Sequence, residues 1–406
     1  MVDNFTSTPA PSLPPKTIIH VYGGTQGSGE QRMLQLVVAN EQEKYHHVII
    51  DLGRNAPSTP LFERMAEAGQ CHYIPLCLEP DAIGANSVML SKKIAECRPD
   101  IIKGWAYPGN AYALLAGQKL QRQRNAPAIL LRLSNPEILD DEQALAEQMK
   151  DKWKKAAYHA IAISDEVAAN YIGMGMPQER IRVIYNGVDS DKYNPREHAL
   201  HRFKSRNALG ISDHVRLIGL VARFDPQKGI EDFLDAARLL HETPGFEDVH
   251  FVLIGNGQDS GNPILQQWIA DRGLDSVMHC AGARDTMPQL YHALDINTLS
   301  SRSEAFGNAI IEAMACGVPV VATDVGMTKA MLGDTGAIVQ AGNPASIADG
   351  WKSLFSRPKT VAEPLAKEGV ERVRSQFNFA TTLQRYIDYY DSIVLSRRKV
   401  AMQPFP

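Results

Sequence analysis

Residues 294–324 read LDINTLSSRSEAFGNAIIEAMACGVPVVATD, and this stretch contains a complete unit of strand, helix and strand. Its two ends, LDINTLSS (294–301) and VPVVATD (318–324), are short apolar runs typical of buried strands, and a helical segment lies between them. The same alternation of short apolar runs with longer amphipathic segments recurs along the chain from Lys16 onward. Alternation of this kind indicates βαβ units and therefore a parallel sheet.

The predicted strands fall into two sets. The first set covers residues 17–22, 47–52, 101–106, 128–134, 159–164 and 182–186. The second set covers residues 215–223, 249–256, 277–282, 294–301, 318–324 and 335–341. A chain of 406 residues is also too long for one ordinary core. We therefore predict an α/β protein with two doubly wound domains in tandem.

The domain boundaries follow from where periodicity stops. In NGVDSDKYNPREHA (186–199), turn residues and charges replace the periodic apolar residues. We therefore predict an N-terminal domain over 17–190 and a C-terminal domain over 200–375. Residues 376–399 form one long helical pattern that could pack on either domain or across both. Residues 1–16 are rich in Pro, Ser and Thr and are expected to be a disordered lead-in.

Composition narrows the class of partner. The formal net charge of −4 gives no basic field that would attract nucleic acid. Five cysteines without a C-x-x-C pair suggest neither a disulfide framework nor a zinc site, which favours a reducing cytoplasm. No stretch reaches the roughly 20 apolar residues of a spanning helix. The basic segment MKDKWKK (149–155) leaves contact with a membrane surface open, although a solvated helix face is the favoured interpretation.

Glu304 and Glu312 are two carboxylates in an otherwise apolar segment. In one continuous helix they would be about 12 Å apart, more than the roughly 6.5–9.5 Å of a glycosidase acid and base pair. We therefore expect the helix to begin at Gly307 and Asn308, with Glu304 in the preceding loop and Glu312 early in the helix. Such a helix start suits a phosphate or developing negative charge. Taken alone, the segment is equally compatible with Glu312 merely complementing the helix dipole.

Arg223 and Lys228 follow a predicted strand in VARFDPQKG (221–229). Ligands of open α/β sheets bind beyond the carboxyl ends of the strands, and a guanidinium with an ammonium suits a diphosphate. Two cations beside a Pro turn are, however, more often only solvated.

Three further loops carry glycines at strand ends. They are LIGNG (253–257), AGAR (281–284) and GGTQGSGE (23–30). Glycines such as Gly255, Gly27 and Gly29 let a ligand approach the backbone closely, but a lone G-x-G is more often a turn than a site. The first loop of the chain has neither G-K-[ST] nor a clean G-x-G-x-x-G, and could instead be a flexible loop facing the second domain.

In this order, the motifs resemble the retaining glycosyltransferases of family 4. The resemblance rests on the E-x7-E pair within SEAFGNAIIEAMACGVPVVATDVG (303–326), on VARFDPQKG and LIGNG, and on RVIYNGVD (182–189). It spans most of the chain and is dense from about 180 to 345. It implies the GT-B fold, in which two Rossmann-like domains face a central cleft. It also implies no metal and no cofactor, with a nucleotide-diphosphate sugar as co-substrate.

The resemblance further implies which residues bind the nucleotide. Arg223 and Lys228 would bind the donor diphosphate and stabilise the leaving nucleotide, in place of a divalent metal. Gly27 and Gly29 would let the first domain close over the diphosphate, and Arg284 would border the base.

On the sugar side, Glu304 and the backbone of Phe306, Gly307 and Asn308 would hold the donor sugar. Glu312 would accept hydrogen bonds from the ribose hydroxyls.

The N-terminal domain departs from the family pattern. Family members commonly carry histidines after the strands that face the sugar, where this chain has KGWAYPGN (103–110) and RLSN (132–135). The first of these resembles a Trp-Tyr-His-Asn arrangement of a surface-polysaccharide branch, with Pro108 in place of histidine. Trp105 and Asn110 are therefore expected on the acceptor or sugar side, and Arg132 is expected to substitute electrostatically. Core packing is the alternative for Trp105.

The predicted function is transfer of a sugar from a nucleotide-diphosphate sugar to a hydroxyl of a glycan or lipid-linked glycan, with retention, in polysaccharide or lipopolysaccharide biosynthesis. The enzyme would be metal-independent and cytoplasmic, with peripheral contact at the membrane face left open. A catalytically silent GT-B-like binding or regulatory subunit is the alternative that the missing histidines suggest. A dinucleotide dehydrogenase would need the glycine fingerprint that residues 23–30 lack.

Overall fold

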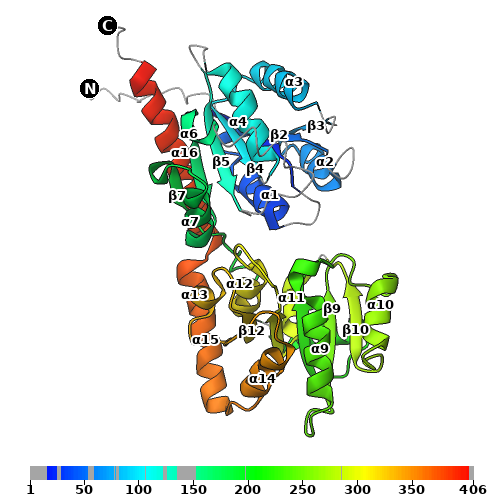
Figure 1. Cartoon of the computed structure of the whole chain (residues 1–406). Coiled ribbons are helices and arrows are strands. Elements are labelled where there is room, and N and C mark those ends of the chain that lie inside the picture. The colour runs from blue at the N-terminus through cyan, green and yellow to red at the C-terminus, as the bar shows by residue number, and fades with distance from the viewer. Residues whose placement is uncertain are drawn as a thin grey trace, which may run out of the picture.

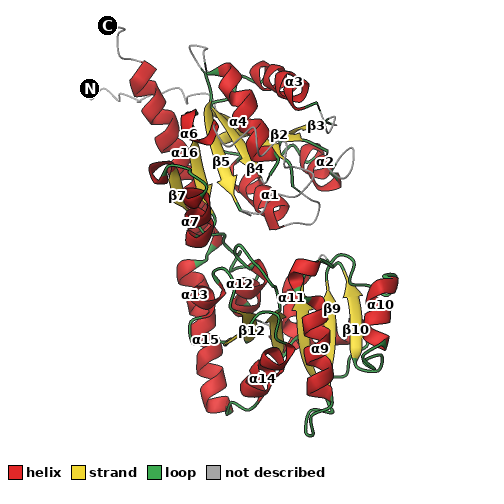
Figure 2. Ribbon diagram, viewed as in Figure 1, coloured by secondary structure: helices red, strands yellow, loops and turns green. Residues whose placement is uncertain are grey.

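A computed structural model describes residues 16–24, 29–53, 59–76, 78, 82–105, 107–121, 126–134, 152–196, 198–284 and 286–401. Two lobes are visible in Figure 1, each built on its own parallel sheet with helices around it. Figure 2 shows the same strands in yellow, flanked by red helices. The predicted fold class of two doubly wound α/β domains is therefore confirmed.

The first sheet has seven parallel strands in the order β3-β2-β1-β4-β5-β6-β7. The strands are β1 (Lys16–Tyr22), β2 (Tyr45–Asp51), β3 (His72–Pro75), β4 (Ile101–Trp105), β5 (Ala128–Leu133), β6 (His159–Ala162) and β7 (Ile181–Val183). The helices are α1 (Gly29–Glu41), α2 (Pro60–Glu67), α3 (Ile83–Glu96), α4 (Gly109–Leu120), α6 (Lys152–Lys155), α7 (Asp165–Gly173) and the 3₁₀ turn η2 (Gln178–Arg180).

The second sheet has six parallel strands in the order β10-β9-β8-β11-β12-β13. The strands are β8 (Arg216–Val221), β9 (Val249–Ile254), β10 (Met278–Gly282), β11 (Ile296–Leu299), β12 (Val320–Thr323) and β13 (Ala337–Val339). The helical elements are α8 (His198–Ala208), η3 (Pro226–Lys228), α9 (Ile230–His241), α10 (Pro263–Ala270), α11 (Met287–Ala293), α12 (Asn308–Ala315), α13 (Thr328–Leu332), α14 (Pro344–Phe355), α15 (Lys359–Gln376) and α16 (Phe379–Ala401).

Every strand predicted from the sequence has a counterpart in these sheets, and one strand was missed. β3 has the sequence HYIP and lies at the edge of the first sheet, where its residues are exposed or half-buried. It is too short and too polar to produce an apolar run. The central strands are the opposite case, because every residue of β4 is buried. Burial on both faces is what a parallel sheet covered by helices requires.

The C-terminal helix α16 returns to the first domain. Its buried Tyr386, Ile387, Tyr390 and Ile393 pack with residues of β1, β4, β5 and β6, and Figure 1 shows the red helix alongside the first sheet. Each such apolar side chain contributes about 1.5–3 kcal/mol when it is fully buried. The residue bounds assigned to the domains stay a prediction.

The chain crosses between the domains twice, and the two crossings are bonded to each other. The backbone N–H of Val188 donates to the carbonyl of Phe377 at 2.8 Å, and the N–H of Phe379 donates to the carbonyl of Val188 at 3.0 Å. In the part of the chain that the structure describes, none of the helices combines the length and apolarity that a membrane crossing needs.

Candidate functional site

A cavity of about 1090 Å³ lies between the two domains. Its walls come from the segments that follow β1, β4 and β5 in the first sheet and β8, β10 and β11 in the second. Since all strands of each sheet are parallel, these segments leave the carboxyl ends of the strands, which is where open α/β sheets bind ligands. The position of the cavity thus follows from the topology.

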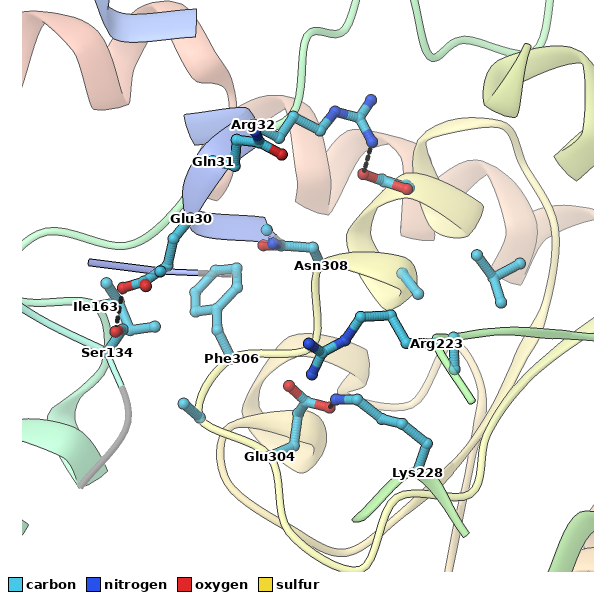
Figure 3. Close-up of a pocket in the computed structure, with 18 of the residues that line it drawn as sticks. Glu30, Gln31, Arg32, Ser134, Ile163, Arg223, Lys228, Glu304, Phe306 and Asn308 are labelled. Atoms are coloured by element: carbon cyan, nitrogen blue, oxygen red, sulfur yellow. Dashed lines mark hydrogen bonds and ion pairs between the residues drawn. The ribbon is translucent and has the colours of Figure 1, made fainter. Parts of the chain in front are cut away.

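Most of the predicted site residues meet at this cavity. Those that line it are Gly29, Asn110, Arg132, Arg223, Lys228, Arg284, Glu304, Phe306, Gly307, Asn308 and Glu312. Figure 3 shows Arg223, Lys228 and Glu304 close together on the second domain, with Glu30 and Ser134 on the opposite side. The structure brings these residues together, while the roles assigned to them stay predictions.

Lys228 and Glu304 form an ion pair in the cavity wall. Nζ of Lys228 lies 2.7 Å from Oε2 of Glu304, which also accepts a hydrogen bond from the hydroxyl of Ser301 at 3.2 Å. Lys228 ends the turn η3, which is capped by the Asp225 carboxylate accepting from the N–H of Gln227. The turn and its cap therefore fix the ammonium beside the carboxylate.

Arg223 is held near the same turn. Its Nη2 lies 3.2 Å from Oδ2 of Asp225, so one carboxylate both caps the turn and pairs with the guanidinium. Two cations thus stand at one end of β8, as the sequence predicts, and each is already beside a carboxylate.

The helix after Glu304 begins where the sequence predicts. α12 starts at Asn308, and Gly307 before it has φ +85°, a left-handed conformation that suits glycine. Glu304 consequently lies in the loop and Glu312 is the fifth residue of the helix. The placement of the two carboxylates is confirmed, and the start of the helix lies at the cavity.

A second helix start faces the first one. α1 begins at Gly29, and a side chain added there would come within 2.5 Å of the Asn308 amide. The same amide group accepts a hydrogen bond from Asn186 at 3.1 Å. Because both helices direct the positive ends of their dipoles at this place, it favours an anion.

Glu312 binds a residue that sequence reasoning missed. Nη1 of Arg32 in α1 lies 2.8 Å from Oε1 of Glu312, and the hydroxyl of Tyr291 donates to Oε2 at 2.8 Å. Burial raises the pKa of Glu312, while Arg32 acts in the opposite direction. The sequence did carry one signal for it: Arg32 lies in the first turn of a predicted helix, where the helix dipole disfavours a cation unless it has an anionic partner.

Arg132 is fully buried behind the cavity wall. Its Nη1 lies 3.1 Å from Oε1 of Glu30, its Nη2 donates to Asn186 at 2.6 Å, and its Nε donates to the hydroxyl of Tyr386 at 3.2 Å. Glu30 also accepts from the hydroxyl of Ser134. Burial raises the pKa of Glu30 against the opposing effects of Arg132 and Ser134. Arg132 thus joins three segments of the chain.

The side chain of Asn110 forms hydrogen bonds with both backbone groups of Arg132, at the end of β5. Its amide donates to the carbonyl of Arg132 at 2.8 Å and accepts from the N–H of Arg132 at 3.1 Å. Asn110 therefore reaches the cavity wall while holding β5 beside α4.

Two of the predicted site residues that the structure describes do not line the cavity. Trp105 is fully buried, and its Nε1 donates to Nδ1 of His20 at 2.9 Å, which fits core packing; its assignment to the acceptor or sugar side stays a prediction. Gly255 has φ +146°, and a Cβ there would lie 1.7 Å from the carbonyl oxygen of Ala222. This close approach of the segment after β8 requires a glycine, and Gly255 is not among the residues that line the cavity. Gly27 lies outside the described residues.

Two family models match the chain on either side of the cavity. The model "Glycosyltransferase Family 4" matches residues 29–192, and "Glycosyl transferases group 1" matches residues 215–357. Together they cover well over half of the 406 residues. The chain belongs to glycosyltransferase family 4.

Curated relatives of this glycosyltransferase align over part of their length. The D-inositol 3-phosphate glycosyltransferase of Paenarthrobacter aurescens is 31% identical over 248 residues, which are 58% of this chain and 58% of that protein. The lipopolysaccharide core biosynthesis mannosyltransferase LpsB of Rhizobium meliloti is 27% identical over 220 residues, 52% of this chain and 61% of LpsB. The chain spans roughly half of the length of such relatives.

Solved structures define the fold of the glycosyltransferase. HepE of Anabaena, in complex with UDP and glucose, superposes with a TM-score of 0.78 at 22% identity, covering 93% of this chain and 100% of HepE. The two facing domains are the GT-B fold predicted from the resemblance. Among the described residues, no group of three or more His, Cys, Asp or Glu could hold a metal ion.

Proposed function

We propose that this family 4 glycosyltransferase transfers a sugar from a nucleotide-diphosphate sugar to a hydroxyl of a glycan or lipid-linked glycan, with retention at the anomeric carbon. The observation that carries the proposal is the arrangement of Arg223, Lys228 and Glu304 beside the start of α12, within a cavity between two GT-B domains. The names of LpsB and of the UDP-bound HepE structure support a nucleotide-sugar donor and a glycan product.

In this proposal, charge on the protein stabilises the leaving group. The acceptor oxygen bonds to the anomeric carbon on the face from which the diphosphate departs, and the bond from that carbon to the phosphate oxygen breaks. The acceptor proton passes to the departing phosphate oxygen. Arg223 and Lys228 stabilise the negative charge that develops on the diphosphate, together with the N–H groups at the start of α12. No side chain has to act as the nucleophile.

Glu304 has two tasks in the same scheme. Its carboxylate accepts hydrogen bonds from hydroxyls of the donor sugar, and it holds Lys228 at 2.7 Å. Glu312, the fifth residue of α12, accepts hydrogen bonds from the ribose hydroxyls. The two carboxylates thereby bind different parts of one donor.

We place the reaction in the cytoplasm, with polysaccharide or lipopolysaccharide biosynthesis as its setting. Cys71, Cys97, Cys280 and Cys316 are free thiols, which supports a reducing compartment. A lipid-linked acceptor would bring the protein to the membrane surface. Of the basic segment 149–155, for which a solvated helix face is favoured over membrane contact, residues 149–151 lie outside the described part of the chain, and residues 152–155 form α6.

The test begins with a panel of uridine and guanosine diphosphate sugars. A donor at about 100 times its Kd stabilises the folded protein by about 2.7 kcal/mol, which raises the melting temperature. Release of free nucleotide diphosphate from that donor is then measured for wild type and for Lys228→Ala, which we expect to lower turnover by about 100-fold or more. Lys352→Ala is the control, because Lys352 is a surface lysine paired with Asp349 on α14.

Three outcomes would contradict the proposal. If no nucleotide sugar stabilised the protein, the proposed donor class would be wrong. If Lys228→Ala kept wild-type turnover, the proposed role of Lys228 in the mechanism would be wrong. Stabilisation without any release of nucleotide would favour the silent binding subunit.

A further inference from the structure

The carboxylate of Glu312 is bound by both domains. Arg32 projects from the first turn of α1 in the first domain, and its Nη1 lies 2.8 Å from Oε1 of Glu312 in the second domain. Figure 3 shows this side chain extended across the cavity, with a dashed line marking the ion pair. The hydroxyl of Tyr291, from α11, donates to Oε2 at 2.8 Å. Each carboxylate oxygen therefore already accepts one hydrogen bond.

Arg32 is itself held in place by the segment that joins the domains. Its Nη2 donates to the hydroxyl of Tyr193, and its guanidinium carbon lies 5.2 Å from the centre of the Tyr193 ring. The Tyr193 ring also contacts the ring of Tyr291, at 6.1 Å between centroids. Arg32, Tyr193 and Tyr291 thus form one connected support behind Glu312.

This support leaves Glu312 able to bind a ligand. An ionised carboxylate has about four acceptor sites, of which Arg32 and Tyr291 use two. Both Arg32 and Glu312 line the cavity, and the side chain of Glu312 is 11% exposed. Two hydroxyls of one ribose would occupy the remaining acceptor sites without displacing Arg32.

The ionised form of Glu312 is needed for this binding, because a protonated carboxyl offers fewer acceptors. The groups that face it are Arg32 from α1, Lys192 and Tyr193 from the connecting segment, Tyr291 from α11 and Cys316 at the end of α12. Of these, Arg32 is the cation in direct contact. Without it, only the Tyr291 hydroxyl and the more distant Lys192 would oppose the rise in the Glu312 pKa that burial causes.

We propose that Arg32 is a positioning residue of the donor site, which keeps the Glu312 carboxylate ionised and oriented so that it can accept the ribose hydroxyls. This inference rests on the proposed function and adds a residue to it. Both domains then contribute to the part of the site that binds the nucleotide. Donor binding by the second domain then depends on an arginine of the first.

The experiment measures the Kd of UDP-glucose, with GDP-mannose as second probe, by calorimetry at several pH values between 5.5 and 8. The expected result for Arg32→Gln is binding about tenfold weaker or more at pH 8, since Glu312 loses the charged partner that orients it toward the ribose hydroxyls. The defect should grow as the pH falls, by at most about tenfold per pH unit, because unpaired Glu312 then becomes protonated. Arg32→Lys keeps the charge and should restore most of the binding and its pH profile.

Two further variants separate positioning from general damage. Glu312→Gln cannot be protonated, so adding Arg32→Gln to it should produce little further loss and no additional pH dependence. Arg238→Gln is the matched control, because Arg238 is also a helical arginine paired with a glutamate, on the surface of α9. It should bind the probes as wild type does.

The outcomes are distinct. Wild-type binding in Arg32→Gln, or tighter binding because Arg32 competes with ribose, would overturn the inference and leave the proposed function standing. A loss that is constant with pH, or that Arg32→Lys does not relieve, would also overturn it. If wild type bound no nucleotide sugar, the proposed function would fail and this inference with it.

Discussion

Replacing Gly326 with alanine is expected to displace the loop that carries Glu304. Gly326 has φ +54°, and a Cβ at this position would lie 2.0 Å from the backbone oxygen of Glu304. Real Cβ atoms essentially never come within 3.0 Å of another heavy atom, so the loop must retreat by about 1 Å or more. Since Glu304 is bonded to Lys228, the displacement reaches the ion pair in the cavity wall.

The expected cost divides into two parts. A left-handed alanine costs about 1 kcal/mol in stability. A displacement of about 1 Å at a catalytic group costs about 100-fold in turnover. The assay is therefore turnover of the donor identified by the sugar panel, together with urea denaturation of the same variant.

Gly333→Ala is the matched control for this prediction. Gly333 has the same φ of +54°, but a Cβ there would meet only the end of the Arg372 side chain, at 3.4 Å. Both variants should lose backbone stability, while only Gly326→Ala should lose turnover. Equal turnover in two folded variants would refute the argument that the Gly326 contact sets the position of Glu304.

Two further predictions concern buried charge. Burial lowers the pKa of His47 to about 3, so between pH 6.5 and 3 the unfolded chain binds the proton and the folded protein does not. The stabilising contribution of neutral His47 should be complete above pH 6.5 and should fall as the pH drops, by at most about 1.4 kcal/mol per pH unit. In urea denaturation between pH 6.5 and 5, His47→Gln should therefore lose less stability with falling pH than wild type does. An unchanged dependence of stability on pH would contradict this prediction. Arg206 is buried and donates to three carbonyls and to Asp295, so Arg206→Met should cost about 3–5 kcal/mol. Arg216→Met, which breaks the more exposed pair with Asp248, should cost less than about 1 kcal/mol, and equal losses would contradict the reasoning.

Local patterns were sufficient for the second half of the site. Strand, loop and helix follow each other directly from 294 to 324, so the start of α12 at Asn308 could be placed from Gly307 and the apolar residues beyond it. Arg223 and Lys228 could likewise be placed, because a predicted strand ends just before them and a Pro turn follows. Each of these predictions needs only about ten neighbouring residues.

The partners of Glu312 could not be predicted in this way. Arg32 lies 280 residues before it, and the contact exists only because two separate sheets present their carboxyl ends to one cavity. The hydrophobic pattern around Arg32 and the pattern around Glu312 each predict a helix, but neither predicts that the two side chains are in contact. A resemblance to a family provides a role for Glu312, but it does not identify the arginine that supports it.

Trp105 shows a different limit. All residues of β4 are buried on both faces, so the strand has no alternation that tells which side chains face a ligand. The sequence predicts the strand and leaves the direction of its tryptophan undetermined. Figure 1 shows β4 in the interior of the first sheet, where helices cover both of its faces.

The return of α16 to the first sheet affects the order of events during synthesis. Domains usually fold in turn as they leave the ribosome, the N-terminal one first. Here the face of the first sheet around Ile18, Ile101 and Leu130 stays uncovered until Tyr386 and Tyr390 have been made. The second domain, which lies between these segments, is complete earlier. The nascent chain therefore completes its second domain before its first, and an apolar face of the first sheet stays uncovered while the 203 residues from the end of β7 to Tyr386 are translated.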